Sequence, residues 1–230
     1  MSRVLALVAE LGAAPAIAAR AGPLSPSSQA RIARLNAPRR RAQSALARQL
    51  AALAASRLLG RELPASCVGE AGDGRGPWLG DAEPLRVSVA HSHERVAVAV
   101  GAGPVGIDVE RCDRQRDWLA FARHAYSDAE VAWLDASAPG ERAARFYLLW
   151  TLREASFKAG LRAAVQGGEP CLGPHANGAS FGWSSRELDG YRVSVATPAP
   201  APIEWLAVAG EELVPLALPR EAAGGATAPG

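Results

Sequence analysis

The sequence predicts an α+β protein in which long helices and short antiparallel strands share one chain. Leucines at helical spacing mark a long helix from Asn36 to Gly60. Alternating apolar residues at 85–89 and 96–100 mark two strands, with His91–Arg95 as the turn between them. Both patterns occur in each half of the 230-residue chain, and the turn Gly101–Pro104 lies at its midpoint.

The other elements follow from the same signals. The N-terminus reads as a first strand and a loop, and Val105–Glu110 as a strand with Asp108 and Glu110 on one face. Ser127 and Glu130 have the spacing of a capping box, which starts a short helix. Further expected elements are a helix at 141–159 stopped by Gly160, strands at 181–183, 191–196 and 205–208, a loop at 167–180, and a disordered tail after about 219.

Composition indicates a globular protein of the cytoplasm. The chain is 49% hydrophobic and 21% charged, and its net charge of +2 says little about partners, so local clusters must carry that argument. The three cysteines form no C-x-x-C pair, so neither a zinc site nor a disulfide framework is expected. Glu10 interrupts the apolar N-terminal stretch, and no run approaches the roughly 18 apolar residues of a membrane span. We therefore expect no membrane association.

Asp108 and Glu110 are candidate metal ligands. They are two residues apart on one strand, so both carboxylates project to the same side beside the small Gly106. Two such charges need a neutralising cation or base, and carboxylate oxygens suit Mg²⁺. The alternative is a solvated strand face on which Glu110 pairs with Arg111.

Glu154 and Lys158 lie on one stripe of the helix at 141–159, together with Tyr147 and Thr151. An ordinary helix ion pair would explain their spacing. It does not explain why Lys158 is the only lysine among 25 lysine and arginine residues. Because a lysine is a compact point charge that can lose its proton, whereas an arginine stays charged, this position is a candidate for a role that needs lysine.

Arginines gather around the start of the long helix, where exposed backbone N–H groups favour phosphate. They are Arg31, Arg34, Arg39, Arg40 and Arg41. The alternative is a solvated basic face, and His91 by itself could be an ordinary surface histidine.

Taken together and in order, these segments resemble the Sfp-like type of 4′-phosphopantetheinyl transferase. The resemblance covers about Arg31 to Gly160. Its segments are Arg39-Arg-Arg41 with Ser44, Val87-Ser-Val-Ala-His-Ser92, Val105-Gly-Ile-Asp-Val-Glu110 and Trp150-Thr-Leu-Arg-Glu-Ala-Ser-Phe-Lys158.

The resemblance implies a role for each matched residue. Asp108, Glu110 and Glu154 would hold Mg²⁺, or alternatively Mn²⁺, and Glu154 would also take the proton from the acceptor serine. Lys158 would steady the pyrophosphate of coenzyme A and protonate the leaving 3′,5′-ADP. The nucleotide and its 3′-phosphate would be held by Arg31, Arg39, Ser44, His91 and Arg75. Two positions depart from the family pattern, because Ala90 replaces a serine and the loop Arg75-Gly76-Pro77 has an extra glycine.

The implied fold consists of two similar halves, 1–102 and 103–230, related by a pseudo-twofold with the active site in the cleft between them. The N-terminal half would bind the nucleotide and the C-terminal half would carry the metal and catalytic residues. The implied protein is a monomeric, cytoplasmic enzyme that activates acyl or peptidyl carrier proteins for polyketide, nonribosomal-peptide or siderophore synthesis.

Two rival functions remain open at this point. A homologue that binds carrier proteins without catalysis would fit the loss of a serine at Ala90. A nucleic-acid-binding module would use the arginines of the long helix and bind with strong salt dependence. The nucleic-acid module leaves Asp108, Glu110 and Glu154 without a role.

Overall fold

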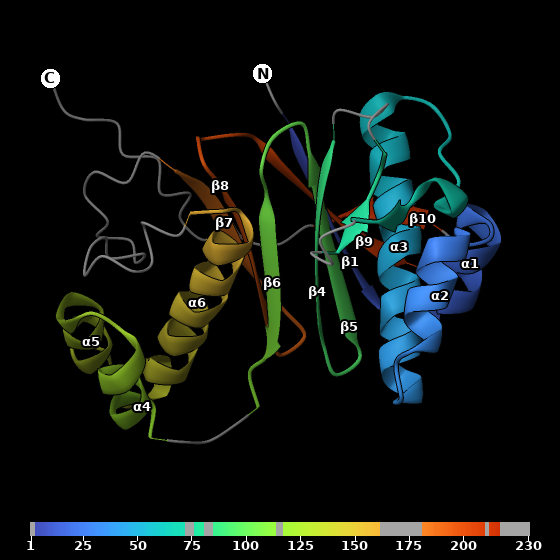
Figure 1. Cartoon of the computed structure of the whole chain (residues 1–230). Coiled ribbons are helices and arrows are strands. Elements are labelled where there is room, and N and C mark those ends of the chain that lie inside the picture. Colours follow the sequence, from blue (N-terminus) through green and yellow to red (C-terminus); the bar gives the residue numbers. More distant parts are fainter. Residues whose placement is uncertain are drawn as a thin grey trace, which may run out of the picture.

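The structure is a computed structural model that describes residues 3–71, 76–80, 85–113, 117–161, 181–209 and 212–216. It has the expected mixture of helices and strands. Figure 1 shows the strands in the middle, with α1–α3 on one side and α4–α6 on the other. The described helices are α1 (Ala14–Ala21), α2 (Pro26–Ala33), α3 (Pro38–Leu59), α4 (Trp118–Ala125), α5 (Asp128–Asp135) and α6 (Pro139–Lys158), with 3-10 turns η1 (Leu11–Ala13) and η2 (Ala65–Cys67). The described strands are β1 (Val4–Glu10), β2 (Gly69–Glu70), β3 (Pro77–Trp78), β4 (Arg86–Ser92), β5 (Arg95–Gly101), β6 (Gly106–Arg111), β7 (Gly182–Leu188), β8 (Tyr191–Thr197), β9 (Ile203–Ala209) and β10 (Glu212–Pro215).

The larger sheet joins strands from both ends of the chain in the order β10-β9-β1-β5-β4. Strand β1 pairs antiparallel with β5 and parallel with β9. Helix α3 covers one face of this sheet, where Leu46 and Leu50 are fully buried in a core that also contains Leu5 and Leu7. This face holds the N-terminal helices in place.

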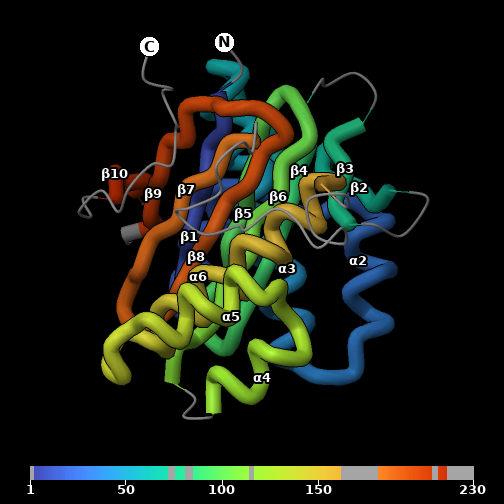
Figure 2. The backbone as a smooth tube through the Cα atoms, turned by 90° about the vertical axis from the view of Figure 1, so that its left-hand side faces the viewer, coloured from blue at the N-terminus to red at the C-terminus, as the bar shows by residue number. Residues whose placement is uncertain are grey.

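The smaller sheet has the order β6-β8-β7 and packs against the larger one. Ile107 and Val109 of β6 share a buried core with Ala97 and Ala99 of β5, so apolar faces of the two sheets meet. The backbone N–H of Ile107 also donates to Ser88 Oγ at 3.1 Å. Figure 2 shows the same arrangement from the side, with α6 lying across the smaller sheet. The opposite face of β6 is therefore left for α6.

Gly106 allows α6 to approach β6 very closely. A Cβ atom at this position would lie 1.8 Å from the backbone oxygen of Ala155 and 2.7 Å from the backbone nitrogen of Ala159. The two backbones can touch here only because glycine has no side chain. Thr151 adds a buried contact on the same helix, with its Oγ1 2.6 Å from Ser194 Oγ of β8. The close contact brings the polar stripe of α6 to the edge of β6.

Several sequence expectations are confirmed and others need correction. The strand at 105–110 and the helix at 141–159 form as β6 and α6, and Ser127 caps α5 in a complete capping box with Glu130. The long helix begins at Pro38, and its N-cap is Ala37 rather than Asn36. His91 lies within β4 and not in the turn, because the strand continues to Ser92.

Helices α1, α2 and α4 and strand β10 were not expected from the sequence. The residues of the expected loop at 167–180 and of the tail after 219 lie outside the described residues. The division at 102/103 and the pseudo-twofold remain predictions.

Candidate active site

Lys158 and Asp108 form the centre of the site. Lys158 Nζ, at the end of α6, donates to Asp108 Oδ1 of β6 at 2.7 Å and to the backbone oxygen of Ile107 at 3.0 Å. Asp108 is only 7% exposed, whereas the Lys158 side chain is 30% exposed. The only lysine of the chain therefore binds a buried carboxylate and still reaches solvent.

Two other carboxylates and Lys158 act on the titration of Asp108. Burial raises the pKa of Asp108 from 3.8 to about 6; Lys158 acts in the opposite direction, and Glu110 and Glu154 raise the pKa further. Like charges act in this way only over short range. The structure therefore brings Asp108, Glu110, Glu154 and Lys158 into one electrostatic unit, although they come from two distant segments.

The donor chemistry of this unit fits a divalent cation. Asp108 Oδ2 is buried and has no hydrogen-bond partner among the described residues. Carboxylate oxygens of this kind are the ligands that Mg²⁺ prefers. Within the same described part of the chain, however, no group of three or more His, Cys, Asp or Glu side chains is already arranged to hold a metal ion. The ligand types fit, and the ammonium of Lys158 is the cation that Asp108 now contacts.

Glu110 is oriented by the end of β4. Ser92 Oγ donates to Glu110 Oε2 at 3.1 Å and accepts from the backbone N–H of Arg111 at 3.3 Å. Glu110 also lines a pocket of about 140 Å³. Its other lining residues are His93, Arg111, Trp118, Phe146, Tyr147 and Trp150. An aromatic pocket therefore adjoins the carboxylates.

His91 faces an arginine of α3. Arg40 donates to the ring of His91, with a distance of 2.7 Å to Nδ1. The pKa of His91 is lowered, first by burial and then by Arg40 and Lys158, so a neutral ring that accepts from Arg40 is favoured. Arg39, the neighbour expected here, lies 3.6 Å from Glu94 instead. Sequence reasoning placed Arg40 in the basic cluster but did not single it out, since adjacent arginines cannot be ranked without the helix orientation.

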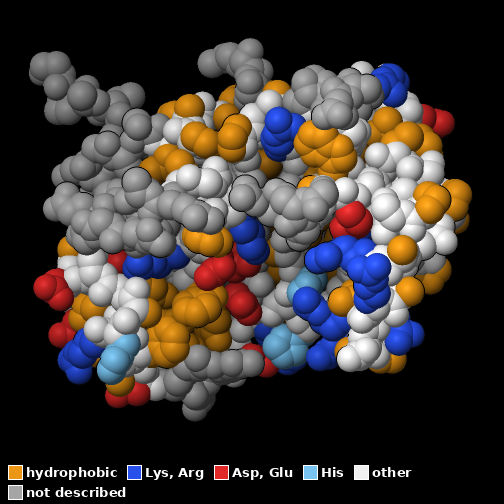
Figure 3. All heavy atoms as spheres, in the orientation of Figure 1, with side chains coloured by type: hydrophobic (Ala, Val, Ile, Leu, Met, Phe, Trp, Pro, Cys, Tyr) orange, Lys and Arg blue, Asp and Glu red, His pale blue; other side chains and the backbone are white. Residues whose placement is uncertain are grey.

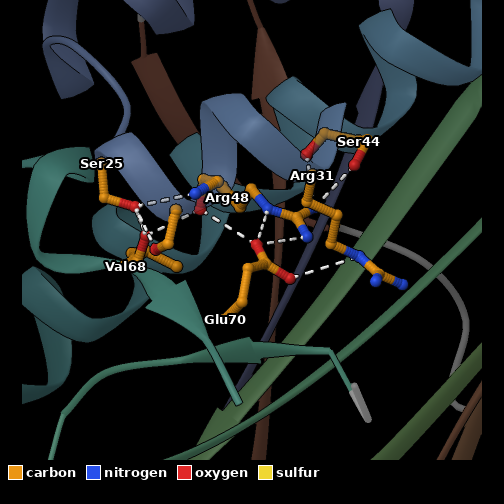
Figure 4. A network of polar contacts seen from close by, with 8 residues as sticks. Ser25, Arg31, Ser44, Arg48, Val68 and Glu70 are labelled. Carbon is orange, nitrogen blue, oxygen red and sulfur yellow. Dashed lines mark hydrogen bonds and ion pairs between the residues drawn. The ribbon is translucent and has the colours of Figure 1, made fainter. Parts of the chain in front are cut away.

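Arg31 and Ser44 meet in a network built around Glu70, shown in Figure 4. Glu70 Oε2 lies 3.3 Å from Arg31 Nε, and Glu70 Oε1 lies 2.6 Å from both Nε and NH2 of Arg48. Arg48 also donates to Ser44 Oγ at 2.7 Å, and Ser28 Oγ donates to Glu70 at 3.0 Å. Arg31 is half exposed and Arg48 is buried. The network thus fixes Arg31 at the surface through partners that the sequence did not reveal.

Acidic and basic side chains face each other on one side of the molecule. In Figure 3, acidic side chains gather near the middle of this face, basic and histidine side chains lie on the side of α2 and α3, and hydrophobic side chains lie over α4–α6. An anionic substrate bound here would meet arginines from one side. On the other side it would meet carboxylates that a cation can neutralise.

Two positions that departed from the family pattern have different outcomes. Ala90 is 5% exposed and belongs to the core between the sheets, so its side chain does not lie at the surface. Arg75 lies outside the described residues, and its role stays a prediction.

Comparison with known proteins supports the resemblance seen in the sequence. A model of the 4′-phosphopantetheinyl transferase superfamily matches residues 104–195, which contain Asp108, Glu110, Glu154 and Lys158. Over this segment the chain is similar to members of that superfamily. The 4′-phosphopantetheinyl transferase gsp of Aneurinibacillus migulanus is 32% identical over 75 residues, which are 33% of this chain and 31% of that protein.

Two relatives are named 4′-phosphopantetheinyl transferase AcpT. The protein of Salmonella typhimurium is 31% identical over 97 residues, or 42% of this chain and 49% of the relative. That of Escherichia coli K12 is 28% identical over 139 residues, or 60% of this chain and 68% of the relative. The chain thus spans less than half the length of the first two relatives that it matches. None of the described helices is both long and apolar enough to cross a membrane.

Proposed function

We propose that the protein is a member of the 4′-phosphopantetheinyl transferase superfamily. It would transfer the 4′-phosphopantetheine group of coenzyme A to a serine of an acyl or peptidyl carrier protein and release 3′,5′-ADP. The observation that carries the proposal is the contact between Lys158 and Asp108, with Glu110 and Glu154 acting on the same carboxylate. This places an acid, a base and the ligand types for a cation beside a basic surface. Phosphoryl transfer needs this combination, because it depends chiefly on charge neutralisation and positioning.

Asp108, Glu110 and Glu154 are the residues that would hold Mg²⁺, with Mn²⁺ as the alternative. When bound, the ion would neutralise charge on the pyrophosphate. Glu154 accepts the proton of the carrier serine, whose oxygen then forms a bond to the phosphorus of the phosphopantetheine group. The bond from that phosphorus to the bridging oxygen breaks, and the departing 3′,5′-ADP takes a proton from Lys158.

The surroundings of Lys158 suit this role. An ammonium has three N–H donors. Two of those of Lys158 donate to Asp108 and to the backbone oxygen of Ile107. Among the described residues, one donor therefore remains for a phosphate oxygen on the exposed side. His91 with Arg40, and Arg31, Arg39 and Ser44, would bind the nucleotide and its 3′-phosphate from the opposite side.

The two-halved, Sfp-like organisation, the monomeric state and a cytoplasmic location belong to the same proposal. So does service to polyketide, nonribosomal-peptide or siderophore synthases. A carrier-binding homologue without catalysis is the alternative. Arg31, Arg39 and Arg40 contact Glu70, Glu94 and His91, respectively. Because these arginines already have partners within the protein, they do not favour the nucleic-acid alternative, which needs an unpaired basic surface.

The test is an incubation of the protein with an apo carrier domain, coenzyme A and Mg²⁺, read by mass spectrometry as the gain of one phosphopantetheine arm. Asp108→Asn and Glu154→Gln should abolish the gain, and removing divalent cations with a chelator should do the same. The matched control is Glu141→Gln, which alters a carboxylate that is 62% exposed on the same helix as Glu154. Full labelling by either site variant would refute the assigned roles, whereas binding of carrier without labelling by the wild type would support the non-catalytic alternative.

A further inference from the structure

Two arginines of α6 attach this helix to α5. Arg145 NH1 donates to the backbone oxygen of Trp133 at 3.1 Å, and its guanidinium lies 4.9 Å from the centre of the Trp133 ring. Two turns further on, Arg153 NH1 donates to Glu130 Oε2 at 3.0 Å, and its guanidinium lies 5.0 Å from the centre of the Tyr126 ring. The two contacts are alike in kind, but only Arg153 is next to the proposed base, Glu154.

The acceptor of Arg153 is an unusually buried carboxylate. The Glu130 side chain is 3% exposed, and its Oε2 accepts from the backbone N–H and the hydroxyl of Ser127, each at 2.9 Å, as well as from Arg153. The sequence indicated only a helix cap here, and a cap needs no arginine. A carboxylate removed from water is costly unless a cation balances it, so Glu130 depends on Arg153.

The Tyr126 ring, over which the Arg153 guanidinium lies, interacts with the proposed base as well as with Glu130. Burial raises the pKa of Tyr126, with Glu130 and Glu154 adding to the effect and Arg153 opposing it. Tyr126 therefore lies within electrostatic reach of both glutamates. The stack and the ion pair together define how the last turns of α6 are rotated against α5.

We infer that Arg153 is a positioning residue for the transfer reaction, which through Glu130 and Tyr126 holds α6 in the rotation that directs Glu154 and Lys158 at the substrate. The inference rests on the proposed function. A planar guanidinium can stack on Tyr126 while it donates to Glu130, which an ammonium does less well.

The experiment compares Arg153→Gln with Arg145→Gln in the full-length protein, by thermal unfolding and by steady-state transfer to an apo carrier domain. Both variants lose a contact between the same two helices, so both should unfold at a lower temperature. Only Arg153→Gln should also lower kcat, by about tenfold to a hundredfold, because displacement of a catalytic group by about 1 Å has effects of this size. The KM for coenzyme A should change less than kcat, since the nucleotide is bound by the other half of the site.

Two further variants complete the experiment. Arg153→Lys should recover part of the lost kcat, and Glu130→Gln combined with Arg153→Gln should cost less than the product of the two single effects. Equal kcat losses in the Arg145 and Arg153 variants, or a normal kcat in Arg153→Gln, would overturn the inference and leave a purely structural contact. If the wild type itself transfers nothing, the proposed function has failed, and this outcome is recognised before any variant is compared.

Discussion

The closest approach between β6 and α6 offers the sharpest test of how the site is assembled. In Gly106→Ala the added Cβ would lie 1.8 Å from the backbone oxygen of Ala155, whereas ordinary contact begins at 3.4 Å. The atom it meets belongs to a helix backbone and cannot rotate away. To relieve the overlap, α6 must move from β6 by about 1.6 Å, the difference between these two distances.

This displacement should affect stability and activity together. Overpacking of this kind costs about 1–3 kcal/mol. We expect the upper end, because the two atoms that the added Cβ would meet, the oxygen of Ala155 and the nitrogen of Ala159, both belong to the backbone. For a protein of this size, about 3 kcal/mol corresponds to a melting temperature lower by about 6–12 °C. Because α6 carries Glu154 and Lys158 while β6 carries Asp108 and Glu110, kcat for carrier modification should fall by about a hundredfold or more.

The assay pairs thermal unfolding with carrier labelling, and Gly103→Ala is the control. A Cβ at Gly103 meets no atom within 4 Å, so this substitution should leave both measurements close to those of the wild type. A Gly106→Ala protein that melts and labels like the wild type would refute the reasoning. In that case the contact between the two backbones would not be what sets the distance between β6 and α6.

Two further predictions concern buried charge. The pKa of Asp108 is raised from 3.8 to about 6 in the folded protein, so the folded state holds this proton more tightly than the unfolded state does. In metal-free protein, the free energy of unfolding should therefore fall by about 3 kcal/mol as the pH rises from about 4 to 6. Denaturant titrations across this range should show a flatter dependence in Asp108→Asn, and an unchanged slope would contradict the raised pKa. Arg48→Gln should lower the free energy of unfolding by about 3–5 kcal/mol, because it leaves Glu70 without its buried partner. The exposed pair between Arg39 and Glu94 is the comparison, and Arg39→Gln should cost about 0–1 kcal/mol in the same titration.

The elements nearest the chemistry were the ones that the sequence predicted best. Alternation makes β6 recognisable, and helical spacing with a terminal glycine makes α6 recognisable, since both depend on local pattern. The start of α3 was predicted less well. Asn36 is a favoured cap residue, yet the helix begins two residues later at Pro38, whose ring already fixes a helical backbone angle.

The partners of the charged side chains could not be predicted in the same way. Spacing along α6 suggested that Lys158 pairs with Glu154, whereas the contact found is with Asp108, which is 50 residues away. Arg48 of α3 and Glu70 of β2 are likewise brought together by the fold and not by any sequence signal. Long-range ion pairs depend on where whole elements cross, and the local patterns of a single sequence do not reveal those crossings.

The parallel pairing of β1 with β9 has a consequence for how the chain reaches its native state. Val4–Glu10 leaves the ribosome before the other described strands, but one of its two neighbours, Ile203–Ala209, is made much later. Until then one side of β1 has no strand to pair with, and an open strand edge invites pairing with other chains. Such distant pairing is slow to form, so the hydrogen bonds of β1 are complete only after the distant β9 has been made.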